Sequence, residues 1–160
     1  MGYTTDPATR VGHIHLKVTN LERAVDFYSN VMGFEVQSRG NRAAFLSAGG
    51  YHHHIGLNTW HSAGTGAAPV NRAGLYHVAF LYPDRRALAE AYRAVLDAGV
   101  TIDGAADHGV SEAIYFRDPD ENGIEIYRDR EPSEWPRDAS GHLDMANDPI
   151  DLAALLAEAR

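Results

Sequence analysis

The sequence predicts an α+β fold made of two tandem units, each with the order strand–helix–strand–strand–strand. The same succession of apolar patterns occurs twice, a glycine follows each helical stretch, and a Gly-, Ala- and Pro-rich segment separates the copies. Because strand side chains alternate between faces, each strand has an apolar side for the helices and a more polar side opposite. We expect the units to form one curved, cup-like mixed sheet with the helices outside.

The first unit is expected over residues 11–60. Its opening strand, "GHIHLKV", alternates apolar and polar residues, and Asn20 then provides a helix cap. Gly33 follows the last apolar residues of the helix and ends it. The strands "FEVQSR", "AAFLSA" and "HHHIGLN" complete this unit.

The second unit repeats this order over residues 75–130, after a linker at residues 61–74. The strand "YHVAFLY" comes first, Asp84 opens the helix and Gly99 ends it. The strands "VTID", "EAIYFR" and "GIEIYR" follow.

Residues 131–160 form a polar C-terminal tail that closes with a short amphipathic helix, "DPIDLAALLAEAR". We expect this tail to pack on a surface or on a partner subunit rather than to take part in chemistry.

Composition excludes several classes of function. The chain has 14 basic and 22 acidic residues and a net charge of -8, which argues against a nucleic-acid-binding surface. It has no cysteine, so disulfide scaffolds, thiolate zinc sites and cysteine nucleophiles are excluded. The N-terminus lacks a secretory pattern and no apolar run reaches membrane-spanning length, so we expect a cytoplasmic protein without a membrane partner.

Strand alternation places three polar residues on the side away from the helices. His13 and His77 occupy equivalent positions in the two copies, and Glu125 lies on the last strand between two buried isoleucines. Two histidines and one carboxylate form a metal-binding set that leaves coordination positions open for other ligands. Without cysteine, a metal held by such groups would be iron, manganese, zinc or nickel.

Three consecutive histidines precede the apolar end of the fourth strand. Metal ligation, acid–base catalysis and a solvent-facing polar cluster are all open interpretations for them. Alternation places His52 and His54 on the side away from the helices and His53 toward the helix layer or an edge. A bulge after Gly49 and Gly50 would reverse this assignment.

Other candidate residues have simpler interpretations. His15 shares a face with the first candidate ligand and is expected to shape a pocket rather than to coordinate. Asp118 and Asp120 belong to "DPDENG", which is typical of a turn. Trp60 and Trp135 either wall a pocket or pack in the core.

The segments "GHIHLKVTNLERAVDFY" and "RDPDENGIEIY", together with the paired units, resemble the vicinal oxygen chelate superfamily over roughly residues 11–130. This superfamily includes glyoxalases, bleomycin- and fosfomycin-resistance proteins and extradiol dioxygenases. The segment "DHGVSEAIYFRDPDENGIEIY" is similar to the active-site signature of extradiol enzymes of the catechol 2,3-dioxygenase type (type I).

This resemblance implies a role for each matching residue. His13, His77 and Glu125 take the positions of the iron ligands, His108 matches a histidine of the second coordination sphere, and Tyr115 matches a tyrosine that hydrogen-bonds the substrate. The implied cofactor is Fe(II), with Mn, Zn or Ni as alternatives.

The implied function is Fe(II)-dependent extradiol cleavage of a catechol-like vicinal diol by O2. The diol protons need acceptors near neutral pH, for which His108, His54 and His52 are the candidates, His54 lying nearer the metal. A metal-dependent lyase or isomerase and a non-catalytic aromatic-drug-binding resistance protein remain alternatives. Gly56 stands where glyoxalase I-like enzymes have an acidic ligand, which counts against their chemistry. We expect a homodimer, in which units pair within a chain or between subunits.

Overall fold

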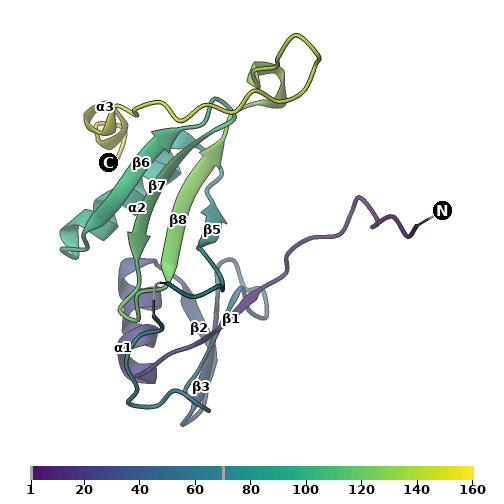
Figure 1. Cartoon of the computed structure of the whole chain (residues 1–160). Helices are drawn as coiled ribbons and strands as arrows, with labels where there is room; N and C mark the ends of the chain where they lie inside the picture. The colour runs from purple at the N-terminus through teal and green to yellow at the C-terminus, as the bar shows by residue number, and fades with distance from the viewer. Residues whose placement is uncertain (1, 70) are drawn as a thin grey trace. The chain divides into compact units, whose positions relative to one another are not determined.

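A computed structural model describes residues 2–69 and 71–160; Val70, in the expected linker, lies outside the described residues. The chain divides into two compact units, one up to Thr65 and one from Gly66 to Arg160. Within the described residues, each unit contains one four-stranded mixed sheet and follows the strand–helix–strand–strand–strand order (Figure 1). The α+β class and the order of elements are confirmed.

The sheet of the first unit has the strand order β1-β4-β3-β2. Its strands are β1 (Ile14–Lys17), β2 (Glu35–Arg39), β3 (Ala43–Ser47) and β4 (Ile55–Asn58). The edge strand β1 runs parallel to β4, and the other pairs are antiparallel. This topology brings the start of β1 next to the segment that leads into β4.

The helix of the first unit is α1 (Leu21–Asp26), which continues as a π-helical turn, η1 (Phe27–Val31). The Asn20 side chain caps it by accepting a hydrogen bond from the Arg23 N–H at 3.1 Å. Gly33 follows with a φ of 77°, a left-handed conformation that glycine adopts without strain. Val18, Tyr28 and Ile55 are fully buried in the core beneath this helix.

The sheet of the second unit has the strand order β5-β8-β7-β6, with α2 (Arg85–Asp97) packed across one of its faces (Figure 1). Its strands are β5 (Val78–Leu81), β6 (Ile102–Asp107), β7 (Ser111–Arg117) and β8 (Gly123–Asp129). The Asp84 side chain caps α2 by accepting from the Ala87 N–H at 2.8 Å. Ile114, Phe116 and Ile126 point to the helix side and are buried. Tyr115 and Glu125 consequently project from the opposite face.

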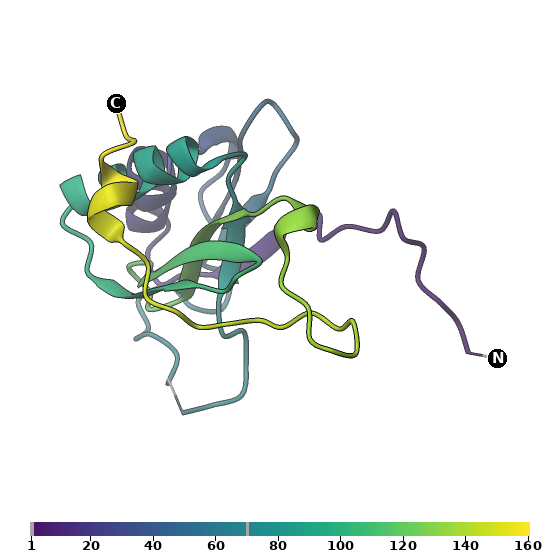
Figure 2. The same ribbon diagram turned by 90° about the horizontal axis from the view of Figure 1, so that it is seen from above.

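The tail contains a 3-10 turn, η2 (Pro132–Glu134), and a short helix, α3 (Leu152–Leu156). After η2 the chain makes a loop and returns across the end of β6 to α3, which lies beside α2 (Figures 1 and 2). Leu155 is fully buried, and the Arg93 guanidinium on α2 donates to the Leu156 carbonyl at 3.0 Å. The tail thus packs on a surface of its own unit.

The fourth strand is shorter than the sequence predicts. It begins at Ile55, and His52 and His53 belong to the connection that enters it. Gly49 and Gly50 open this connection with φ angles of 65° and 74°. His54 continues the ladder, since its N–H donates to the Leu46 carbonyl at 2.8 Å.

No helix in the described part of the chain combines the length and apolarity needed to cross a bilayer.

Candidate functional site

Two of the three predicted metal ligands meet in the second unit. Glu125 lies in the middle of β8, opposite Ala79 on β5 and Tyr115 on β7. His77 immediately precedes β5, and its Nε2 lies 2.8 Å from Glu125 Oε2. Only 9% of Glu125 is exposed, so its carboxylate needs partners for its charge. The imidazole and the carboxylate can pair with each other or bind one cation together.

Gly123 allows His77 to approach β8. A Cβ at Gly123 would lie 2.2 Å from the Tyr76 carbonyl oxygen and 3.1 Å from the His77 Cβ. Any side chain there would displace the backbone that carries His77. In the sequence, Gly123 is recognisable only as the first residue of the strand "GIEIYR", and nothing local indicates this close approach.

A chain of hydrogen bonds links the carboxylate to His108. The Tyr115 hydroxyl lies 3.3 Å from Glu125 Oε1 and 2.7 Å from His108 Nε2, so its one proton can be donated to either group. The other ring nitrogen, His108 Nδ1, lies 2.9 Å from the carbonyl oxygen of Ala146 in the tail. The structure therefore brings the predicted residues His77, Glu125, Tyr115 and His108 into one polar group.

Tyr115 remains a hydroxyl donor across the neutral pH range. Burial raises its pKa, and the charge and hydrogen bond of Glu125, with a smaller contribution from Tyr76, raise the pKa further, to about 12. A phenol in this state offers its proton to a neighbouring oxygen or nitrogen.

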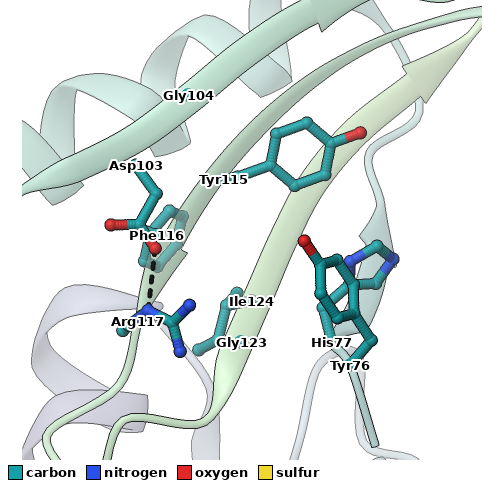
Figure 3. Close-up of a pocket in the computed structure, with 9 residues that line it drawn as sticks. All are labelled: Tyr76, His77, Asp103, Gly104, Tyr115, Phe116, Arg117, Gly123 and Ile124. Atoms are coloured by element: carbon teal, nitrogen blue, oxygen red, sulfur yellow. Dashed lines mark ion pairs between the residues drawn. The ribbon is translucent and has the colours of Figure 1, made fainter. Parts of the chain in front are cut away.

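A cavity of about 400 Å³ opens beside this group (Figure 3). Figure 3 shows Tyr115 on one side of β8 and Tyr76 with His77 on the other. An ion pair of 2.9 Å between Arg117 and Asp103 lies among its lining residues. The lining residues are Tyr76, His77, Asp103, Gly104, Tyr115, Phe116, Arg117, Gly123 and Ile124. The cavity has the size of a small aromatic ligand and borders two of the predicted site residues.

The third predicted ligand, His13, lies in the first unit just before β1. Its ring contacts His53, with ring centroids 4.5 Å apart, and His53 also contacts Phe45 at 5.1 Å. The prediction that His53 points toward the helix layer is wrong, since Phe45 lies on the face opposite the buried Ala44 and Leu46. Strand alternation does not extend through this histidine run, because β4 begins only at Ile55.

The other two histidines of the run have different surroundings. His52 is exposed, and its Nδ1 lies 2.7 Å from the Nδ1 of His53. His54 Nδ1 accepts from the Ala48 N–H at 3.2 Å, and its ring contacts Tyr51. His54 thus helps to hold the connection, and His53 is the member of the run that contacts the predicted ligand.

The surroundings of His53 lower its pKa and so favour its neutral form. Partial burial lowers its pKa first, and positive charge on His13, His52, His15 or His54 lowers the pKa further. A neutral imidazole can accept a proton, so His53 joins the acid–base candidates. The Gly49–Gly50 pair was the signal in the sequence that could have indicated its direction.

An aromatic group continues from this point across the first sheet. The His15 ring contacts Phe45 at 5.8 Å and Trp60 at 5.4 Å. It lies over Gly56, where an added Cβ would come within 2.9 Å of the ring. His15 and Trp60 therefore form part of this face of the sheet.

Two further candidates have structural roles. The Asp118 carboxylate accepts from the backbone N–H groups of Asp120 and Asn122, both at 2.9 Å, as in the predicted turn. The Trp135 indole N–H donates to the Arg130 carbonyl at 2.9 Å and holds the start of the tail.

The grouping of the predicted ligands differs between the units. The second unit brings His77 and Glu125 together, and the first contributes His13 beside His53. Neither unit, in its described residues, gathers three His, Asp or Glu side chains in positions to hold a metal.

Comparison with known proteins identifies related chains. A family model described as the Glyoxalase/Bleomycin resistance protein/Dioxygenase superfamily matches residues 10–126, which confirms the resemblance seen in the sequence. A catechol-2,3-dioxygenase from Bacillus subtilis (strain 168) is 42% identical over 151 residues, covering 94% of this chain and 52% of that protein. A manganese-dependent 2,3-dihydroxybiphenyl 1,2-dioxygenase from Geobacillus genomosp. 3 is 31% identical, covering 87% and 42%. The chain thus spans about half the length of these curated relatives.

Among solved structures, a glyoxalase/dioxygenase from Nostoc punctiforme aligns with a TM-score of 0.64 at 19% identity, covering 82% of this chain and 99% of that chain. At this identity the likeness concerns the fold.

Proposed function

We propose that this chain, which belongs to the glyoxalase/bleomycin resistance/dioxygenase superfamily, is an extradiol dioxygenase that opens the ring of a catechol-like diol with O2. One observation carries the proposal: His77, Glu125, Tyr115 and His108 form a single hydrogen-bonded group. The relatives named as catechol and dihydroxybiphenyl dioxygenases support the same reaction class.

The donor set fits a divalent metal. An imidazole nitrogen and a buried carboxylate oxygen 2.8 Å apart are the ligand types that Fe(II) and Mn(II) accept. We propose that His77 and Glu125 hold the ion with His13 as the third ligand, and that the chain acts as a homodimer. We favour Fe(II), and manganese is the alternative because one relative carries it in its name.

When bound, the metal lowers the pKa of vicinal hydroxyl groups and leaves positions open for small ligands. The remaining roles belong to this chain's own residues. Tyr115, which keeps its proton, donates a hydrogen bond to a substrate oxygen beside Glu125. His108 Nε2 lies one hydrogen bond behind that hydroxyl and can accept a proton through it.

His53 is our candidate for a second proton acceptor. It is the histidine of the run that contacts His13, and its lowered pKa favours its neutral form. His54 helps to position His53 by holding the backbone of the connection. His52 does so through the contact between its ring and the His53 ring. At Gly56 no carboxylate is available to complete a glyoxalase I-like ligand set, so the dioxygenase reaction is preferred.

The test combines metal analysis with oxygen uptake. The chain is loaded anaerobically with Fe(II) or Mn(II), and catechol and a dihydroxybiphenyl are supplied in an oxygen electrode. We expect oxygen uptake together with a yellow ring-fission product.

Glu125→Ala should lose both metal and oxygen uptake, because a carboxylate ligand is removed. Asp103→Ala is the matched control, since Asp103 lines the same cavity but pairs with Arg117, and it should keep the metal. Full metal occupancy in Glu125→Ala would contradict the ligand assignment.

A further inference from the structure

We propose that residues 144–148 of the tail, here called the strap, are a positioning element for the site. The strap fixes the His108 ring with the proton on Nδ1 and with Nε2 directed at Tyr115. The effect of the strap on turnover rests on the proposed function. The effect of the strap on the His108 tautomer is independent of that function.

The strap is bound by its backbone to the end of β6. Asp107 and Asp148 exchange two hydrogen bonds, from the Asp107 N–H at 2.8 Å and from the Asp148 N–H at 2.9 Å. The Ala146 N–H donates to the His108 carbonyl at 3.1 Å. Since β6 is an edge strand, the strap satisfies backbone groups that its sheet leaves unpaired at this end.

The contact with Ala146 determines the His108 tautomer. A backbone carbonyl only accepts hydrogen bonds, so the Nδ1 that lies 2.9 Å from it must carry a proton. In the neutral ring Nε2 is then the acceptor, and it receives the Tyr115 hydroxyl at 2.7 Å. When His108 is protonated, Nε2–H donates to the Tyr115 oxygen, and the hydroxyl proton turns to Glu125 Oε1 at 3.3 Å. The strap therefore selects Nε2 as the nitrogen that exchanges a proton with Tyr115.

Water in place of the strap would not make this selection. A water molecule accepts from either ring nitrogen, so both tautomers of the neutral ring would become accessible. With the proton on Nε2, the ring could no longer accept from the Tyr115 hydroxyl. The chain from His108 to Glu125 would then lose its fixed direction.

The strap is anchored at both of its ends. On one side, α3 docks on α2 through the buried Leu155 and an ion pair between Arg85 and Glu158. On the other side, Pro136 packs against the His108 turn, where a Cβ at Gly109 would lie 2.8 Å from Pro136 Cγ. These anchors keep the Ala146 carbonyl in place.

The tautomer can be measured without metal or substrate. The ¹⁵N-labelled full chain is studied by long-range ¹H–¹⁵N correlation NMR of its imidazoles, with His108→Gln used to assign the His108 signals. We expect Nδ1 to be protonated and Nε2 to be the acceptor. In Ala146→Pro the N–H that holds His108 is lost, so the two tautomers should mix.

Two further variants keep the test decisive. Ala139→Pro is the matched control, because Ala139 is the first central residue of a turn closed by the Gly141 N–H and the Asp138 carbonyl at 3.0 Å, a position that accepts proline. It should leave the His108 tautomer unchanged. Leu155→Ala loosens the α3 anchor far from the ring and should shift the tautomer in the same direction as Ala146→Pro, but less.

Kinetics of the metal-loaded chain provide a second readout. Ala146→Pro should retain its metal and its KM while kcat falls about 10- to 100-fold, as for residues that orient a catalytic group through a hydrogen bond. A proton on Nε2 in the unsubstituted chain, or an unchanged tautomer in both Ala146→Pro and Leu155→Ala, would overturn the proposal. If the unsubstituted chain turns over no diol, the proposed function fails, and the NMR result alone decides the role of the strap.

Discussion

The two units place different side chains at matching positions of the same sheet. In each unit the first strand runs parallel to the last, and a histidine immediately precedes it. In the first unit the facing pair of residues on these two strands is His15 and Gly56. In the second unit it is Ala79 and Glu125. The larger side chain of the pair is on the first strand in the first unit (His15) and on the last strand in the second unit (Glu125). Each pair therefore combines one large and one small residue but offers a different chemical group.

The third strand continues the contrast. Phe45 faces Gly56 in the first unit, and Tyr115 faces Glu125 in the second. The first unit thus presents an aromatic face beside His13, and the second presents a hydrogen-bonded carboxylate beside His77. The same strand order thus carries aromatic rings in the first unit and, in the second, a hydrogen-bonded histidine–carboxylate group that we propose to bind metal and transfer protons. The substitutions below alter one copy to test this division.

The largest effect is expected from Gly123→Ala. Its Cβ would meet the Tyr76 carbonyl at 2.2 Å, and this backbone must move, which separates His77 from Glu125. We expect the free energy of unfolding to fall by about 3 kcal/mol and metal affinity to be lost. The clashing atom belongs to the Tyr76 backbone, which, unlike a side chain, cannot rotate away from the new methyl group. Urea unfolding and a metal titration measure the two effects.

Two matched variants accompany this experiment. Gly56→Ala in the first unit meets the His15 ring, a side chain that can turn aside, and should cost about 1 kcal/mol. Gly104→Ala borders the same cavity as Gly123 but has no atom within 4 Å of its added Cβ, so its stability should stay near that of the unsubstituted chain. An unaltered metal affinity in Gly123→Ala would contradict the role given to this glycine.

An intermediate effect is expected from Tyr115→Phe, which gives the second unit the ring found at Phe45. The change removes the hydroxyl between His108 and Glu125 but leaves the proposed metal ligands intact. Oxygen uptake should fall about 10- to 100-fold with metal content unchanged. Phe45→Tyr, the reverse change in the first unit, removes no hydrogen bond and should alter uptake by less than about tenfold. Equal losses in both variants would show that the units do not divide the roles as proposed.

The smallest effect concerns pH and is confined to the second unit. Partial burial raises the pKa of Asp107, but hydrogen bonds from the Gly109 N–H and Arg130, together with the charge of Arg130, outweigh this and hold the pKa below its ordinary value of 3.8. A lowered pKa in the folded state stabilises the protein above the ordinary value, and this contribution disappears as the pH falls through the lowered pKa.

Asp107→Asn should therefore reduce the free energy of unfolding by about 1 kcal/mol at neutral pH. The difference between the variant and the unsubstituted chain should shrink as the pH falls to about 3 and below. Urea unfolding over this pH range provides the measurement. A difference that stays constant down to the lowest pH would mean that the carboxylate of Asp107 contributes no charge-dependent stability.

Regular elements could be predicted from local sequence. The caps Asn20 and Asp84 and the stop at Gly33 follow from short-range hydrogen bonding and backbone geometry, and all three are found as expected. The meeting of His77 and Glu125 followed from strand alternation, because Glu125 lies in the regular pairing of β5 with β8 and His77 stands one residue before it.

Two features of the site depend on irregular or distant contacts. His53 takes its direction from a connection that precedes the ladder of β4, where alternation gives no information. The contact between His108 and Ala146 joins residues 38 positions apart without a local motif. Such a contact arises from the path of the tail across the sheet edge, which side-chain periodicity does not encode.

The close fit of His15 over Gly56 limits how this repeat can change over evolutionary time. A carboxylate gained at position 56 would enter the space of the His15 ring, 2.9 Å from the new Cβ, so the order of substitutions matters. The His15 ring would have to turn aside or be replaced by a smaller residue to make room for an acidic side chain on that strand. A change of chemistry at this position of the fold thus involves two facing residues, and the order in which they change sets how well the intermediate is tolerated.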